Sequence, residues 1–212
     1  MNRKQKSRAW LHDHINDPYV KQAQKDGYRS RAAYKLLEIQ EKDKFIQPHM
    51  TIVELGAAPG SWTQILSKMV DPKKGGRVIA LDLLPMDPVP HVEIIQGDFH
   101  EDETVNRLIT SLEGRSLDLV VSDMAPNMSG IEVVDQAKIM YLAELALDFT
   151  LRYGHIGSHL LMKVFHGEGF DDVMKLIKIH FTQFYVRKPE ASRSRSSETY
   201  LLAKNMRKKL ED

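Results

Sequence analysis

Residues 51–62 read Thr-Ile-Val-Glu-Leu-Gly-Ala-Ala-Pro-Gly-Ser-Trp, an apolar run followed by a stretch of small residues. The run 51–55 is short and apolar, as buried strands are, and residues 60–69 have the spacing of a helix. Gly56 and Gly60 lie between the two, where small residues let a ligand approach the backbone closely. This stretch therefore predicts a strand, a ligand-binding turn and a helix, the first unit of a parallel α/β sheet.

Strands and helices alternate along the rest of the chain. Strands are predicted at residues 51–55, 77–81, 92–96, 117–122, 159–164 and 184–187, with a seventh at 198–203. Helices are predicted at residues 30–42, 60–69, 102–112, 132–150 and 170–180. This alternation predicts an α/β fold with a doubly wound, mostly parallel sheet and helices on both faces. Ligands of such folds bind at the carboxyl ends of the strands.

The composition narrows the class of protein further. The 212 residues, 42% of them hydrophobic, fit one domain over 1–212 with a basic N-terminal extension at about 1–28. The absence of cysteine excludes a disulfide scaffold, a thiolate zinc site, an iron–sulfur cluster and a cysteine nucleophile. His12 and His14 have no acidic partner at ligand spacing, so no metal site is expected. We find no apolar run of membrane length and no apolar signal core, and we expect a cytoplasmic monomer.

Positive charge is concentrated at both ends of the chain. Residues 1–44 contain 11 Lys or Arg and 6 Asp or Glu, residues 187–209 contain 8 and 2, and residues 45–186 contain 11 and 19. Two basic ends on an acidic body indicate a polyanionic partner if both fold onto one face; solubilising tails are the alternative. The candidate phosphate contacts are Arg8, Lys21, Lys25, Arg29, Arg31, Arg193 and Arg195.

Carboxylates follow the second and third predicted strands. Asp82 stands where an acidic residue commonly accepts hydrogen bonds from ribose hydroxyls. Asp98 could accept from an adenine amino group, with Phe99 against the ring, although a helix cap or turn former is the alternative for each aspartate. The turn at 56–60 lacks the full glycine pattern of a dinucleotide site, so a nucleoside without phosphates fits better than NAD.

A carboxylate and a lysine end the next two predicted strands. Asp123 follows residues 117–122, and Lys163 lies inside the apolar run 159–164. A lysine there is costly if it points into the core; the alternative is a side chain at the mouth of the strand that reaches solvent. Because Asp123 and Lys163 end consecutive strands, we expect one active cleft to hold both.

Long sequence blocks in a fixed order point to a known family. The blocks are Arg29-Ser30-Arg31-Ala32, Leu55-Gly56-Ala57-Ala58-Pro59-Gly60, Asp82-Leu83-Leu84-Pro85-Met86, Gln96-Gly97-Asp98-Phe99, Ser122-Asp123-Met124-Ala125-Pro126-Asn127-Met128-Ser129-Gly130 and Lys163-Val164-Phe165. Through them the chain resembles the FtsJ/RrmJ family of ribose 2′-O-methyltransferases, which use S-adenosylmethionine. The resemblance is closest to the bacterial branch that methylates a uridine ribose in the peptidyl-transferase region of 23S ribosomal RNA. Ser61 departs from the family pattern, which commonly has glycine there.

The resemblance implies a fold, a cofactor and a catalytic set. The fold is the Rossmann-like class I methyltransferase fold with a seven-stranded sheet. The Lys-Asp-Lys-Glu catalytic set falls on Lys35, Asp123, Lys163 and Glu198. The S-adenosylmethionine site falls near Gly60, Trp62, Asp82, Asp98 and Asp123, to which the strand-end reading adds Gly56 and Phe99. The implied partner is 23S ribosomal RNA, and we expect the assembled large subunit to be the substrate.

The residues leave the proton acceptor and the exact function open. Lys163 could act as general base; because an ordinary lysine is charged at neutral pH, the alternative is that Lys163 orients the 2′-oxygen and Asp123 accepts the proton. A non-catalytic RNA-binding ribosome-assembly factor, or a methyltransferase acting on a different RNA, are the alternative functions. Methylation of a base amino group is disfavoured, because no aromatic residue follows Pro126.

Overall fold

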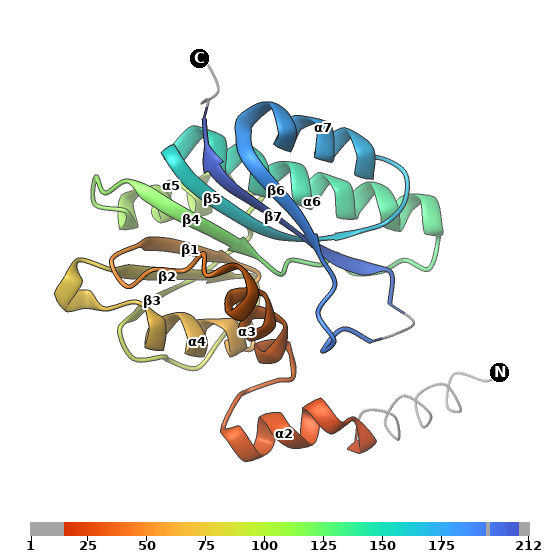
Figure 1. Cartoon of the computed structure of the whole chain (residues 1–212), viewed down its shortest axis with the longest axis horizontal. Coiled ribbons are helices and arrows are strands. Elements are labelled where there is room, and N and C mark those ends of the chain that lie inside the picture. Colours follow the sequence, from red (N-terminus) through yellow and green to blue (C-terminus); the bar gives the residue numbers. More distant parts are fainter. Residues whose placement is uncertain (1–14, 194–195, 208–212) are drawn as a thin grey trace.

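The centre of the molecule is a sheet. In the computed structural model, which describes residues 15–193 and 196–207, seven strands are ordered β3-β2-β1-β4-β5-β7-β6 (Figure 1). The strands are β1 (Thr51–Leu55), β2 (Arg77–Asp82), β3 (Val92–Gln96), β4 (Leu117–Ser122), β5 (Gly154–Phe165), β6 (Phe181–Arg187) and β7 (Glu198–Met206). The helices are α2 (Pro18–Asp26), α3 (Ala32–Asp43), α4 (Ser61–Met69), α5 (Asp102–Ser111), α6 (Glu132–Tyr153) and α7 (Phe170–His180), with a short 3₁₀ turn at Pro72–Lys74.

The strand pairing confirms the predicted mostly parallel sheet. β1 pairs in parallel with β2 and β4, β2 with β3, and β4 with β5. β7 lies antiparallel between β5 and β6. The carboxyl ends of β1 to β5 therefore meet along one edge, while β7 enters that edge at its first residues.

Some elements are longer than predicted. β5 begins at Gly154 instead of residue 159, and β6 begins at Phe181 instead of residue 184, because both strands keep pairing with their neighbours over these residues. Helix α2 lies within the part of the chain expected to be a basic extension. Asp17 caps its first turn by accepting hydrogen bonds from the amides of Tyr19 and Val20. In Figure 1, α2 lies beside α3 and apart from the sheet.

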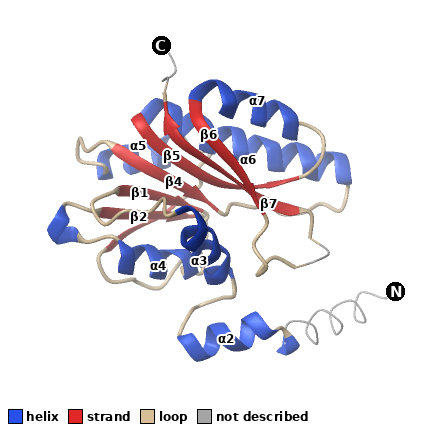
Figure 2. Ribbon diagram, in the orientation of Figure 1, coloured by secondary structure: helices blue, strands red, loops and turns tan. Residues whose placement is uncertain are grey.

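Each face of the sheet carries its own hydrophobic core. Helices α3 and α4 cover one face, and α5, α6 and α7 cover the other (Figure 2). Along β4 the side chains alternate, so that Leu119 and Val121 pack under α3 and α4 while Val120 packs on the opposite face. All five residues of β1 are buried, as expected for a central parallel strand.

None of the helices in the described residues is both long enough and apolar enough to span a membrane.

The turn after β1 leaves no room for side chains at its glycines. Gly56 has φ of 76°, and a Cβ there would lie 2.8 Å from the backbone of Met124 in the segment after β4. Gly60 has φ of 104° and begins α4 as its N-cap. Close packing at Gly56 therefore brings the ends of β1 and β4 together.

The variant Gly56→Ala tests this packing. We expect it to lower the free energy of unfolding by about 3 kcal/mol, from the left-handed backbone and the contact with Met124 together. Gly75→Ala is the matched control: its φ is 84°, but nothing lies within 4 Å of the added Cβ, so a loss of only about 1 kcal/mol is expected. Equal losses in urea unfolding would contradict the role of the contact.

Candidate active site

The register between β5 and β7 gathers the site residues on one face. Lys163 lies directly opposite Tyr200 in this antiparallel pair. Because side chains alternate along a strand, Lys163 points to the same face as Leu161, and Glu198 to the same face as Tyr200. Leu161 and Tyr200 both belong to the core under α3 and α4. Strand register alone therefore brings Lys163, Glu198 and Tyr200 to the side that α3 covers.

Asp123, which follows β4, connects this group to the centre of the sheet. Lys163 Nζ donates to the main-chain oxygen of Asp123 at 2.5 Å and lies 3.0 Å from Asp123 Oδ1. The Tyr200 hydroxyl donates to the same Oδ1 at 2.8 Å. The side chain of Lys163 is 8% exposed and that of Asp123 is 23% exposed, so the carboxylate keeps an open side. Burial, Asp123 and Glu198 raise the pKa of Tyr200, which therefore remains a donor.

A second ion pair lies beside the first. Lys35 Nζ on α3 is 2.5 Å from Oε1 of Glu198, and each side chain is 12% exposed. Burial alone would raise the pKa of Glu198, but the charge and hydrogen bond of Lys35, with a further contribution from Lys163, hold that pKa below its usual value. The structure thus brings together all four residues of the expected set, as two neighbouring lysine–carboxylate ion pairs.

Two further carboxylates line the same edge of the sheet. Asp82 accepts the amide of Ala58 at 2.8 Å through Oδ2 and the amide of Leu84 at 2.8 Å through Oδ1. Asp82 therefore shapes the turn after β1 while keeping lone pairs for a ligand. Asp98 accepts two hydrogen bonds from His100, which lower the pKa of its carboxyl group.

Glu54 is a buried carboxyl group beneath the turn. Its residue is 2% exposed, and Oε2 accepts a hydrogen bond of 2.6 Å from Thr63 Oγ1 on α4. Burial raises the pKa of Glu54 to about 8, against the hydrogen bonds from Thr63, and the charges of Asp123 and Asp82 raise it further. Glu54 is therefore mostly neutral at pH 7. A charged residue inside the apolar run 51–55 was the available sequence signal for this group.

Two residues expected at the cofactor have side chains committed to the core. The Trp62 indole is 2% exposed, donates to the main-chain oxygen of Ala32 at 2.7 Å and packs on Tyr200. Phe99 is 7% exposed, and its ring lies edge-on to Phe149, 5.5 Å away between centroids. The Phe99 ring thus packs in the core in this structure, and its expected contact with a ligand base stays a prediction.

Arg29 holds the ligand turn instead of standing free for phosphate. Its guanidinium donates to the main-chain oxygens of Pro59, Asp87 and Pro88 at 2.9–3.0 Å. The Ser61 hydroxyl is 2.7 Å from that of Ser30, which gives the serine at this position a partner in the segment that carries Arg29.

Arg31 is also engaged within the protein. It pairs with Asp17, donates to the main-chain oxygen of Ala191 and lies over the ring of Tyr19. Burial and the nearby Arg193 lower its pKa. In this structure both Arg29 and Arg31 connect segments of the fold, and the phosphate contacts expected of them stay predictions.

The other basic candidates differ in accessibility. Lys21 and Lys25 are exposed on α2, and Arg193 is half-buried beside Arg31. Arg8 and Arg195, with His12 and His14, lie outside the described residues. Within residues 15–193 and 196–207, no group of three or more histidine and acidic side chains is placed to hold a metal ion.

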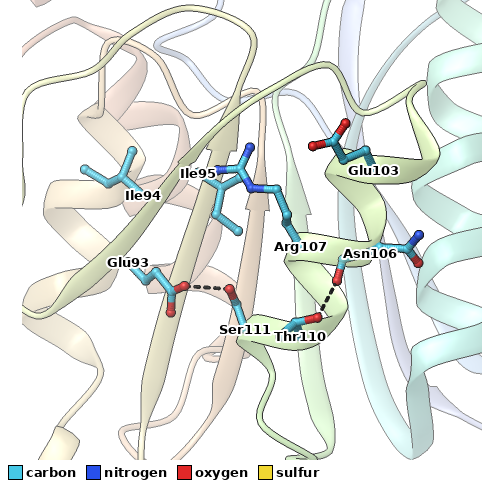
Figure 3. A pocket seen from close by; sticks show the side chains of 8 residues that line it. All are labelled: Glu93, Ile94, Ile95, Glu103, Asn106, Arg107, Thr110 and Ser111. Carbon is cyan, nitrogen blue, oxygen red and sulfur yellow. Dashed lines mark hydrogen bonds between the residues drawn. The ribbon is translucent and has the colours of Figure 1, made fainter.

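A surface groove of about 650 Å³ lies between β3 and α5 (Figure 3). Two of its polar side chains are bonded within the protein: Ser111 donates to Glu93 at 2.5 Å, and Thr110 donates to the main-chain oxygen of Asn106 at 2.8 Å. The groove contains none of the residues of the strand-end site, so we do not assign it to that site.

The strand-end arrangement favours one kind of chemistry. The carboxylates can accept hydrogen bonds from hydroxyl and amino groups of a ligand. The Lys163–Asp123 pair can hold a second hydroxyl and take up its proton. An acidic ligand subsite beside a lysine–carboxylate pair is thus suited to moving a group onto an oxygen atom.

Known proteins resemble this chain over most of its length. A family model described as FtsJ-like methyltransferase matches residues 28–206. The chain is 57% identical over 198 residues to the ribosomal RNA large subunit methyltransferase E of Alkalilimnicola ehrlichii, covering 93% of this chain and 94% of that protein. It is 53% identical over 204 residues to the protein of the same name from Legionella pneumophila, covering 96% and 98%. A crystal structure of a ribosomal RNA methyltransferase from Plasmodium falciparum matches with a TM-score of 0.75 and 29% identity, over 84% of this chain and 98% of that one.

The raised pKa of Glu54 predicts a pH dependence of stability. The unfolded chain releases this proton near the ordinary pKa of 4.5, and the folded protein releases it only near pH 8. The stability of the wild-type protein therefore decreases as the pH rises from 4.5 to 8. Glu54→Gln removes this loss, and its stability relative to wild type should rise by up to about 1.4 kcal/mol per pH unit in that window. Urea unfolding at several pH values measures the slope. Glu144→Gln, at an exposed position of α6, is the control; a constant difference between Glu54→Gln and wild type would contradict the assignment.

Proposed function

The chain belongs to the FtsJ-like methyltransferase family, and from this premise we propose that it transfers a methyl group from S-adenosylmethionine to a ribose 2′-oxygen in RNA of the large ribosomal subunit. The observation that carries the proposal is the Lys163–Asp123 pair at the carboxyl edge of the sheet. A hydroxyl group needs both orientation and a proton acceptor to attack a methyl group, and this pair offers both. Methylation of a base amino group has less need for such a lysine.

The carboxylate groups of the site fit S-adenosylmethionine. Its ribose hydroxyls and adenine amino group are hydrogen-bond donors, and Asp82 and Asp98 are acceptors at the ends of adjacent strands. Its sulfonium is a cation, and Asp123, which follows β4 at the same edge of the sheet, would supply a negative charge for it. When bound, S-adenosylmethionine supplies a methyl group that is already a good electrophile.

Lys163 and Asp123 have complementary roles toward the acceptor hydroxyl. In this structure Lys163 donates to the main-chain oxygen of Asp123, and its nitrogen lies 3.0 Å from the carboxylate oxygen Oδ1 as an ion pair. A lysine ammonium has three N–H groups, so one remains to orient the 2′-oxygen. When S-adenosylmethionine is bound, the bond from the 2′-oxygen to the methyl carbon would form as the methyl–sulfur bond breaks, leaving S-adenosylhomocysteine, and the hydroxyl proton would pass to the Asp123 carboxylate, directly or by exchange through Lys163. Tyr200 holds that carboxylate in place throughout.

Lys35 and Glu198 act as the second pair of the set. Glu198 lies opposite Phe165, two positions from Lys163 along β5. The low pKa of Glu198 keeps it negative and paired with Lys35. We assign Glu198 to holding Lys35 at the mouth of the cleft, where its charge can meet a ribose or phosphate oxygen.

The RNA assignment rests on charge and on the relatives. The curated relatives are named for ribosomal RNA of the large subunit. Lys21, Lys25 and Arg193 remain available for phosphate contacts, which are the main source of affinity for RNA. By resemblance we assign the target to a uridine of 23S ribosomal RNA on the assembled subunit. A base inside a folded particle must leave its stack to reach the cleft.

The variant Lys163→Ala separates catalysis from cofactor binding. We expect a loss of methyl transfer of at least about 100-fold, the usual scale for a positioned acid or base, with S-adenosylmethionine affinity changed only a few-fold. Lys175→Ala, which removes an exposed lysine paired with Asp172 on α7, is the control and should keep full activity. A joint loss of activity and cofactor affinity in Lys163→Ala would mean that Lys163 supports the cofactor or the fold.

The proposed reaction is tested with labelled S-adenosylmethionine and large ribosomal subunits that lack the modification. Naked 23S RNA is assayed in parallel, and the product is mapped by alkaline hydrolysis. We expect label in an alkali-resistant dinucleotide, because a 2′-O-methyl group protects the adjacent phosphodiester. Label found only in alkali-sensitive products would show that the methyl group is attached to a base. Cofactor binding without any transfer would favour an assembly factor or a different RNA.

A further inference from the structure

Asp98 is held by His100 from one side only. The amide of His100 donates to Asp98 Oδ1 at 3.0 Å, and the ring Nδ1 of His100 lies 2.6 Å from the same oxygen. A carboxylate only accepts, so the imidazole carries its proton on Nδ1. Within residues 15–193 and 196–207, Oδ2 of Asp98 has no hydrogen-bond partner. One oxygen is thus fixed, and the other is left for a ligand.

The His100 ring is itself held in place by helix α6. It stacks on Tyr141, with centroids 5.5 Å apart and planes inclined by 25°. Both side chains are on the surface: His100 is 43% exposed and Tyr141 50% exposed. Exposed rings that stack without a core around them restrict each other's rotation. Tyr141 therefore limits the directions in which His100 can hold Asp98.

A fixed carboxylate distinguishes ligands better than a free one. A free carboxylate can turn about its Cβ–Cγ bond and present either oxygen, so it can adapt to different base edges. With Oδ1 occupied, Asp98 presents one acceptor in one direction. The hydrogen bonds that lower the pKa of Asp98 also keep this group a pure acceptor at neutral pH. Such an acceptor binds the 6-amino group of adenine and repels the 6-oxo group of hypoxanthine.

We propose that His100, held by Tyr141, is a positioning residue that makes Asp98 selective for a 6-amino purine in the nucleoside subsite. The inference rests on the proposed function, because that function places the adenine ring at Asp98. It goes beyond it in assigning the selectivity to two residues outside the strand ends. His100 does not touch the reacting atoms; it acts through Asp98.

The test compares two product-type ligands by calorimetry, without catalysis. S-adenosylhomocysteine and S-inosylhomocysteine differ at purine position 6, amino against oxo, and at the neighbouring N1, which accepts a hydrogen bond in adenine and donates one in hypoxanthine. For the wild-type protein we expect a preference for the adenosyl ligand of about 30-fold, within the range for a hydrogen bond to a charged group. Asp98→Asn should lower the preference below about threefold, since its amide group can also donate.

Three variants isolate the contribution of the His100 ring. His100→Phe keeps an aromatic ring for Tyr141 but removes the ring hydrogen bond, and its preference should fall to about fivefold. His100→Asn, whose amide can donate to Asp98 Oδ1, should recover most of the wild-type preference. Tyr141→Phe keeps the stack and should match wild type. Thermal unfolding of each variant is recorded, and little change is expected at these exposed positions.

The outcomes separate the inference from the proposed function. An unchanged preference in His100→Phe, together with its loss in Asp98→Asn, would show that Asp98 acts alone and would overturn the inference while leaving the function standing. If the wild-type protein bound the two ligands equally well, the purine would not contact Asp98 through position 6, and the inference would be overturned as well. If the wild-type protein bound neither ligand, both the inference and the proposed methyl donor would fall.

Discussion

Lys163 and Tyr200 both donate hydrogen bonds to Asp123, and this contact constrains how β4, β5 and β7 lie beside one another at the site. It joins three strands: Asp123 directly follows β4, β5 carries Lys163 and β7 carries Tyr200. A lysine buried on an apolar strand is costly unless it is paired, and the Asp123 carboxylate is its partner. The antiparallel insertion of β7 between β5 and β6 is what supplies the third member. The contact that stabilises the buried charge of Lys163 thus also lies at the centre of the proposed catalytic site.

Much of the fold could be predicted from sequence because its signals are local. Apolar runs with intervening helical spacing predict the order of strands and helices along the chain, and the structure confirms the mostly parallel sheet. The ends of elements were less predictable. Gly154 begins β5 well before the apolar run, because pairing with a neighbouring strand, which is not local, decides how far a strand extends. Helix α2 depends on the Asp17 cap and on packing near Tyr34, and the basic character of the segment concealed it.

The residues of the candidate site could be predicted where they follow the ends of strands. They were harder to predict where their role depends on contacts with other parts of the fold. Asp123 and Lys163 follow from consecutive strands that end at one edge. Arg29 is of a residue type that commonly contacts phosphate, yet in this structure its guanidinium donates to three main-chain oxygens around the turn. The Tyr200 contact depends on strand register, and the stack of His100 on α6 depends on tertiary packing. Neither register nor packing is written in a single local pattern.

The most direct test of the central claim is a crystal structure with S-adenosylhomocysteine and an RNA fragment that contains the target uridine. The measured quantity is the distance from the ribose 2′-oxygen to Lys163 Nζ and to the Asp123 carboxylate. We predict that the 2′-oxygen lies within hydrogen-bond reach of Lys163, at about 3 Å, and faces the ligand sulfur across the edge of the sheet. A base atom in that position, or a 2′-oxygen held by other residues, would contradict the account.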